Sequence, residues 1–320
     1  MSNREIERTT ALPIRGPSKK APCPCGSGQR ANSCCKKKGS WYRHPVALCT
    51  TGPRADYKHQ KCYAGSTLDC SKKISREHYI SAIILRSFDS LSVTGFPWLE
   101  DGETKMLPVD ALASNILCGR HNAALSPLDS SGGSFYQAIR EFSSAPFDPV
   151  NSLGKSDQFR IYNGYDFERW MLKVLCGVLA SGSAKLDGKK IADWQPPEDW
   201  LDILFNNSLL STPESGLYVV TLSAPKAADP VKARNEIGYA ILASEGDPLR
   251  ISGIYMELGG FGFMLSLKGT PKHQKSGYHV RHRPEQLIFV DKNCNLRALE
   301  LSWLGPRRNV YITVAPPGVV

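Results

Sequence analysis

The sequence predicts an α+β protein, with Cys- and His-rich elements first and a mainly antiparallel sheet with helices after them. Seven strand-like runs lie beyond residue 216, and Gly259-Gly260 between two of them is a hairpin signal. Before these runs, apolar side chains at helical spacing from Phe167 to Leu179 predict an amphipathic helix. The cysteines predict the first part, because eight of the ten precede residue 120 and their clustering is typical of metal binding.

We divide the chain into four parts: a flexible basic arm at 1–20, a Cys-rich element at 21–40, a second Cys/His domain at 41–130, and an α+β domain of recognition or regulatory type at 131–320. Serines and glycines at 130–134 predict a loop at the last boundary. Helices are expected at 122–128, 135–142 and 200–205. The predicted strands are 217–223, 237–243, 251–258, 261–267, 286–290, 296–301 and 310–314.

Four cysteines lie within thirteen residues in the first element. Cys23 and Cys25 precede a Gly-Ser-Gly turn, and Cys34 and Cys35 follow it. Glycine permits the tight turn that a small metal loop needs, so we expect the four thiolates to bind zinc. The pattern resembles the SEC-C motif, a short zinc-binding element. The lysines after it, Lys36, Lys37 and Lys38, are candidates to contact nucleic acid, the ribosome or an acidic protein partner; alternatively, zinc only stabilises this element.

A second set of ligands spans the segment 62–121. Cys62 and Cys70 form one pair and Cys118 with His121 the other, which is enough for a tetrahedral structural zinc site. Alternatively, Cys49 or His44 takes the place of Cys62.

Between these pairs lie residues suited to metal-assisted hydrolysis. Glu77 is a hard oxygen ligand, and His78 has an ordinary pKa of about 6.5 that suits proton transfer at neutral pH. Asn122, directly after the second pair, is an amide oxygen donor. Together such groups can hold a hydrated Mg²⁺ and deprotonate a water molecule against a phosphodiester.

This segment resembles the HNH endonucleases, in the branch that reads Cys pair, Ser-x-Glu-His, then Cys-x-x-Cys-Asn-Asn. Residues 75–78 match the first block and residues 118–129 the second. The resemblance implies a zinc-bound treble-clef (ββα-metal) domain in which His78 is the general base and Glu77 and Asn122 hold a catalytic Mg²⁺ or Mn²⁺. Asn115 is a second candidate for the middle Asn of the family name.

The charge distribution indicates a polyanionic partner. The net charge is +10, and residues 1–76 hold sixteen Lys/Arg against four Asp/Glu. Such a field favours nucleic acid, and Arg76 and Arg120 are candidates to neutralise its backbone. The apolar run at 171–180 contains Lys173 and is too short to span a bilayer, and the N-terminus is charged where a signal peptide is apolar. We therefore expect a cytoplasmic protein without a membrane partner.

We conclude from the sequence that the chain is a metal-dependent HNH-type endonuclease acting on nucleic acid, with DNA favoured and bacterial defence as a setting. The alternative is a non-catalytic zinc-binding adaptor that docks on nucleic acid, ribosome or a protein partner, through the SEC-C-like element or the C-terminal domain. A third hypothesis is a nuclease held inactive until its C-terminal domain binds a signal.

Overall fold

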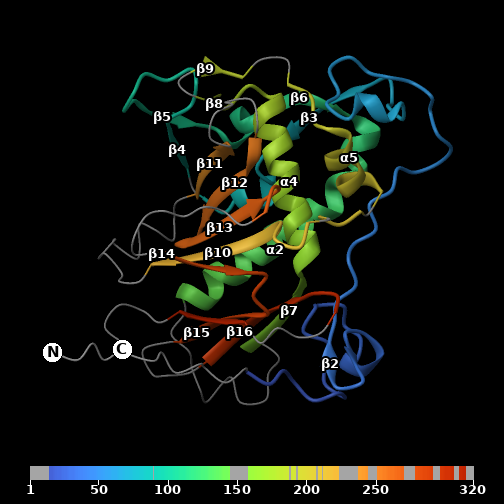
Figure 1. Cartoon of the computed structure of the whole chain (residues 1–320), viewed down its shortest axis with the longest axis vertical. Helices are drawn as coiled ribbons and strands as arrows, with labels where there is room; N and C mark the ends of the chain where they lie inside the picture. The colour runs from blue at the N-terminus through green and yellow to red at the C-terminus, as the bar shows by residue number, and fades with distance from the viewer. Residues whose placement is uncertain are drawn as a thin grey trace. The chain divides into compact units, whose positions relative to one another are not determined.

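The structure is a computed structural model of the whole chain, and it shows a mixed α+β protein with few helices and several sheets (Figure 1). It describes residues 14–88, 90–144, 158–186, 189–191, 194–206, 208–210, 212–222, 237–243, 251–269, 278–290, 296–305 and 310–314. The predicted arm at 1–20 therefore lies largely outside the described residues. Within the described ranges, no helix is long and apolar enough to cross a membrane.

Two compact units interleave along the chain. Unit 1 is formed by Met1–His44, Glu141–Asn163 and Arg283–Val320, and unit 2 by Pro45–Arg140 and Gly164–His282. Each unit contains one of the two predicted zinc elements.

Unit 1 contains a four-stranded mixed sheet in the order β17-β15-β16-β7. Strands β15 and β16 form an antiparallel hairpin, whereas β17 and β7 join its two edges in parallel. The bounds are β7 Phe159–Asn163, β15 Gln286–Val290, β16 Leu296–Ser302 and β17 Tyr311–Val314. The Cys-rich element adds η1 Ala31–Ser33, β1 Lys36–Lys37 and β2 Ser40–Trp41.

The Cys-rich element packs against this sheet. Cys23, Cys35 and Trp41 share a buried cluster with Phe159, Ile161 and Ala298. The rings of Trp41 and Phe159 are 5.3 Å apart, and the backbone N–H of Ile161 donates to the carbonyl oxygen of Pro24. The element is therefore part of the core of unit 1.

Unit 2 contains a five-stranded antiparallel sheet in the order β11-β12-β13-β10-β14. Its strands are β10 Gly216–Leu222, β11 Ile237–Ala243, β12 Ile251–Leu258, β13 Phe261–Ser266 and β14 Tyr278–His282. Helix α4, Gly164–Ala180, contacts β10, β12 and β13 (Figure 1). Helix α5, Glu198–Phe205, packs against α4, and β8 Lys185–Leu186 pairs with β9 Lys189–Lys190.

Helix α4 is buried on all sides, so its charged residues need partners inside the protein. Asp166 accepts a 2.5 Å bond from Arg169 and 3.1 Å bonds from the backbone N–H of Val46. Glu168 accepts from the backbone N–H of Leu217 at 2.7 Å. The helix is thus fixed by charge-assisted bonds as well as by apolar packing.

Helix α2, Gly119–Ser144, is continuous through the predicted loop at 130–134, so that prediction is wrong. The glycines there allow close packing. A Cβ atom on Gly132 would lie 2.5 Å from Trp170, and one on Gly133 would lie 2.8 Å from Ile83. The helices expected at 122–128 and 135–142 are therefore two parts of one.

The second Cys/His segment is organised around a two-stranded antiparallel sheet, called the hairpin below, and α2. Strands β3 Ile74–His78 and β6 Ala113–Cys118 pair antiparallel, and α2 follows β6 directly. The connection contains α1 Ala82–Leu85, the antiparallel pair β4 Leu91–Thr94 and β5 Thr104–Leu107, and η3 Val109–Leu112. The segment also holds η2, Gly65–Thr67.

Candidate zinc centres and the buried Glu77 cluster

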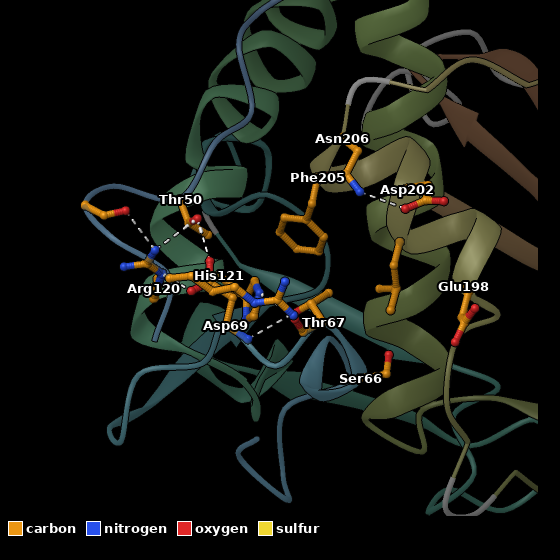
Figure 2. A pocket seen from close by; sticks show the side chains of 13 residues that line it. Thr50, Ser66, Thr67, Asp69, Arg120, His121, Glu198, Asp202, Phe205 and Asn206 are labelled. Carbon is orange, nitrogen blue, oxygen red and sulfur yellow. Dashed lines mark hydrogen bonds and ion pairs between the residues drawn. The ribbon is translucent and has the colours of Figure 1, made fainter. Parts of the chain in front are cut away.

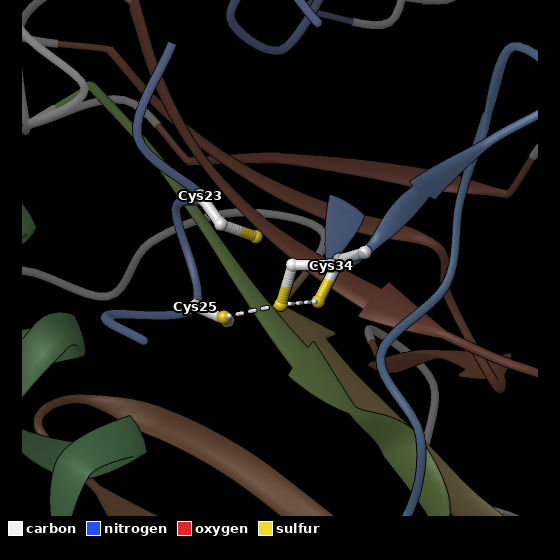
Figure 3. Close-up of side chains that lie close together, drawn as sticks. Cys23, Cys25 and Cys34 are labelled. Atoms are coloured by element: carbon white, nitrogen blue, oxygen red, sulfur yellow. Dashed lines mark hydrogen bonds between the residues drawn. The ribbon is translucent and has the colours of Figure 1, made fainter. Parts of the chain in front are cut away.

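The first candidate centre lies in unit 1, where four thiols converge. The sulfur atoms of Cys25 and Cys34 are 3.5 Å apart and those of Cys34 and Cys35 are 3.6 Å apart; with Cys23 they lie within 4.8 Å of one another (Figure 3). Gly26 and Gly28 have φ of 81° and 74°, a left-handed conformation that glycine adopts at low cost. The four thiols are compatible with a structural zinc ion.

The environments of these thiols differ. Burial raises the pKa of Cys35, and the neighbouring thiols raise it further. Burial acts in the same direction on Cys25, but hydrogen bonds from Ser27 and from neighbouring thiols outweigh it and lower the pKa of Cys25 to about 7. Deprotonated sulfur is the form that binds zinc, so Cys25 is close to that form at neutral pH.

The three lysines after this centre are placed differently. Lys36 Nζ donates to the carbonyl oxygen of Pro17 at 2.8 Å and lies 4.9 Å from the Trp41 ring centre. Its ammonium group is therefore engaged within the element. Lys37 and Lys38 are exposed.

The second candidate centre lies in unit 2 and is buried. His121 Nδ1 is 3.2 Å from the sulfur of Cys118, 3.6 Å from that of Cys62 and 3.7 Å from that of Cys70. Cys118 ends β6 and His121 lies in the first turn of α2, so the hairpin and the helix hold one pair of ligands. This set is compatible with a structural zinc ion. It contains Cys62, whereas Cys49 is exposed outside it and His44 belongs to unit 1.

Thr67 orients the His121 ring for this role. Its Oγ1 donates to the carbonyl oxygen of Ala64 at 2.8 Å and lies 3.0 Å from His121 Nε2, so it accepts the Nε2 proton. That tautomer leaves the Nδ1 lone pair directed at the thiols. Burial lowers the pKa of His121 to about 4, so the ring is neutral at pH 7. Phe205 packs against the ring at 4.8 Å between centroids.

Glu77 lies inside unit 2, in an ion-pair cluster. Its side chain is 6% exposed, and Oε1 is paired with Lys173 Nζ, which is 1% exposed. Lys173 Nζ also donates to both carboxylate oxygens of Asp129 at 2.7 Å. Burial opposes the charge of Lys173, but Asp129 and Glu77 outweigh it and raise the pKa of the lysine. Burial raises the pKa of Glu77 more than Lys173 lowers it.

The other predicted catalytic residues lie nearby on the same hairpin and helix. His78 Nε2 is 3.4 Å from Asp110 Oδ1, and burial lowers the pKa of His78 more than Asp110 raises it. Asn122 Nδ2 donates to Ser75 Oγ at 2.7 Å, and Asn115 is exposed on β6.

No contact among the described residues supports a catalytic divalent ion at Glu77 and Asn122. Glu77 Oε1 faces an ammonium group, and the amide of Asn122 is bonded to a serine. These contacts give the ion no support, and the assignment of Mg²⁺ or Mn²⁺ stays a prediction.

The two predicted phosphate-contacting arginines also differ. Arg120 is mainly structural: Nε is 3.0 Å from Asp69 Oδ1, and the Nη atoms donate to Thr50, Thr51 and Gly52. Arg76 is exposed and donates to the carbonyl oxygen of Asp110.

A polar pocket of about 430 Å³ opens beside the second centre (Figure 2). The loops around Arg54 and Thr67 form one wall, and Glu198, Asp202 and Phe205 of α5 form the other. Both charge signs line it, and the donors of Arg120 at its edge are already engaged.

Sequence reasoning missed Lys173 and the role of Asp129. The available signal was a single lysine inside an apolar helical run, since a lysine is almost never fully buried without a partner.

Comparison of the chain with family models, with curated proteins and with solved structures finds no match.

Proposed function

We propose that the chain is a zinc-stabilised nucleic-acid-binding protein whose second centre has the treble-clef arrangement of the HNH family. The order of ligand loop, hairpin and helix around Cys62, Cys70, Cys118 and His121 supports this arrangement. The two clusters supply rigidity, since bound zinc would contribute directly to folding.

The observation that carries the proposal is the charge around the second centre. Six basic side chains within 54–76 are exposed; of the two acidic residues there, Asp56 is paired with Arg54 at 3.3 Å and half-buried Asp69 is paired with Arg120. The exposed residues are Arg54, Lys58, Lys61, Lys72, Lys73 and Arg76. Tyr57, 40% exposed, lies between Arg54 and Lys58 in the sequence. Cations beside an exposed aromatic ring are typical of surfaces that hold a phosphate backbone and stack a base.

The test is binding of labelled duplex DNA, single-stranded DNA and RNA by fluorescence anisotropy at several salt concentrations. Each phosphate contact contributes about 0.9 to the slope of log K against log salt on duplex DNA, so Lys72→Gln/Lys73→Gln should lower the slope by about 2. The matched control is Lys105→Gln/Lys268→Gln, which removes the same charge from exposed positions elsewhere in unit 2. If both variants lose the same affinity and slope, the effect depends on overall charge and not on the position of Lys72 and Lys73. Absence of binding to all three probes would refute the proposal.

Hydrolysis of the bound nucleic acid is the second candidate, favoured by His78. This side chain lies on the hairpin, is 20% exposed, and has a lowered pKa, so it is a neutral base at pH 7. If the chain cleaves supercoiled plasmid in Mg²⁺ or Mn²⁺, His78→Ala should lower the rate by a factor of about 10² to 10⁴ while keeping its zinc. If the unmodified protein binds nucleic acid but does not cleave it, hydrolysis is refuted and only the binding function is retained.

A further inference from the structure

Lys173 lies at the centre of a closed set of polar contacts in unit 2. It comes from the middle of α4 and meets Glu77 of β3 and Asp129 of α2. Strand β3 and helix α2 therefore each bring a carboxylate to the ammonium group of α4.

All three N–H bonds of Lys173 have carboxylate acceptors. Two go to Oδ1 and Oδ2 of Asp129 at 2.7 Å, and the third position is paired with Glu77 Oε1. Asp129 Oδ1 also accepts a 2.5 Å bond from Ser81 Oγ, which in turn accepts from Trp170 Nε1 at 2.8 Å. Hydrogen bonds from Ser81 and Trp170 thus fix the position of Asp129 next to the ammonium group.

The two carboxylates supply oxygens of the kind that bind a divalent ion. Hard cations take carboxylate and hydroxyl oxygens from several elements at once. Here the three carboxylate oxygens contact an ammonium group.

We infer that Lys173 is a built-in cation that takes the place of a divalent ion between Glu77 and Asp129. The centre then joins α4 to the zinc hairpin without a metal, and removal of the ammonium group converts it into a divalent-cation site. This inference does not depend on nucleic-acid binding, so either can fail alone.

The experiment is Mn²⁺ binding, followed by equilibrium dialysis and electron paramagnetic resonance, in the full chain with its zinc retained. Lys173→Met removes the charge and keeps a long apolar side chain. We expect it to gain one Mn²⁺ site that binds at least about tenfold tighter than any in the unmodified protein, because two carboxylates then lack their cation. Lys173→Met/Glu77→Gln should lose that gain.

Two outcomes would overturn the inference. One is a Mn²⁺ site in the unmodified protein that disappears in Glu77→Gln, since Lys173 would then yield to metal. The other is a Lys173→Met protein that keeps both zinc ions but gains no site.

The unmodified protein provides a test that does not need the variant to fold. The ammonium group of a buried, triply bonded lysine gives a slowly exchanging ¹⁵N signal. We expect the Lys173 signal to persist when Mn²⁺ is added; its selective broadening would show metal at Glu77 and contradict the inference.

Discussion

Gly132 and Gly133 allow α2 to approach its neighbours more closely than any other residue would. A Cβ atom at Gly132 would overlap the Trp170 ring, which is fully buried. Glycine in a helix interior normally lowers stability relative to alanine, so its presence here is explained by packing.

Gly132→Ala should therefore destabilise the protein by about 1–3 kcal/mol, although the same change on an exposed helix face would be stabilising. Urea unfolding monitored by circular dichroism measures the difference. The control is Gln137→Ala, at an exposed position of the same helix, which should change stability by less than about 0.5 kcal/mol. A gain of stability in Gly132→Ala would mean that the two helices have room to separate.

Thr67 should control how tightly the second centre holds zinc, because it fixes the His121 tautomer. Thr67→Val keeps the shape and removes the acceptor, and we expect zinc affinity to fall by about 10- to 100-fold. Competition with a colorimetric chelator measures it. Thr104→Val, on exposed β5, is the matched control; equal zinc release from both variants would show that the Thr67 hydroxyl has no such role.

At the scale of elements, local patterns predicted helices α4 and α5 and the strands of the C-terminal part best. Strands β10 to β13 and β15 to β17 begin and end within one residue of the predicted bounds, because alternating apolar residues and flanking turns report strand position. Strands β1 to β9 and β14 were not predicted: several have only two to four residues, and β7 (FRIYN) and β14 (YHVRH) are short runs without regular apolar alternation. Sheet membership was not accessible, because β7 pairs with β16 far along the chain.

The same limit explains the sites. Cysteine spacing indicated both candidate centres, since zinc ligands come in short sequence pairs. The partner of Glu77 comes from a helix almost a hundred residues later, and no local pattern links the two.

Because the Cys-rich element covers the sheet of unit 1, loss of its zinc should loosen that sheet. We expect Cys25→Ser/Cys34→Ser to increase hydrogen exchange in β7 and β16 and to leave β10, β12 and β13 unchanged. Mass spectrometry of the exchanged protein measures this. Cys49→Ser, an exposed thiol outside both clusters, is the control. Unchanged hydrogen exchange in β7 would show that the zinc-bound element does not protect this strand.

At the scale of the whole molecule, each unit has its own main sheet and its own Cys/His cluster. We therefore expect the loss of one cluster to lower the stability of its own unit more than that of the other.

Fluorine NMR of 5-fluorotryptophan-labelled protein in a urea series tests this. In Cys25→Ser/Cys34→Ser, the signals of Trp41 and Trp303 in unit 1 should report unfolding at lower urea, and those of Trp170 and Trp200 in unit 2 should keep their midpoint. A common shift of all four would mean that the two units unfold together.

Because unit 1 is formed from both ends of the chain, its parts are synthesised at different times. Cys35 and its core neighbour Ala298 are separated by about 260 residues, which a ribosome adds in roughly 13 to 50 s. During that interval the four thiols of the first centre lack the strand against which they pack. Early capture of zinc by the nascent chain would protect those thiols from oxidation and mispairing until the last strands arrive, so metal supply during translation would govern the yield of correctly folded protein.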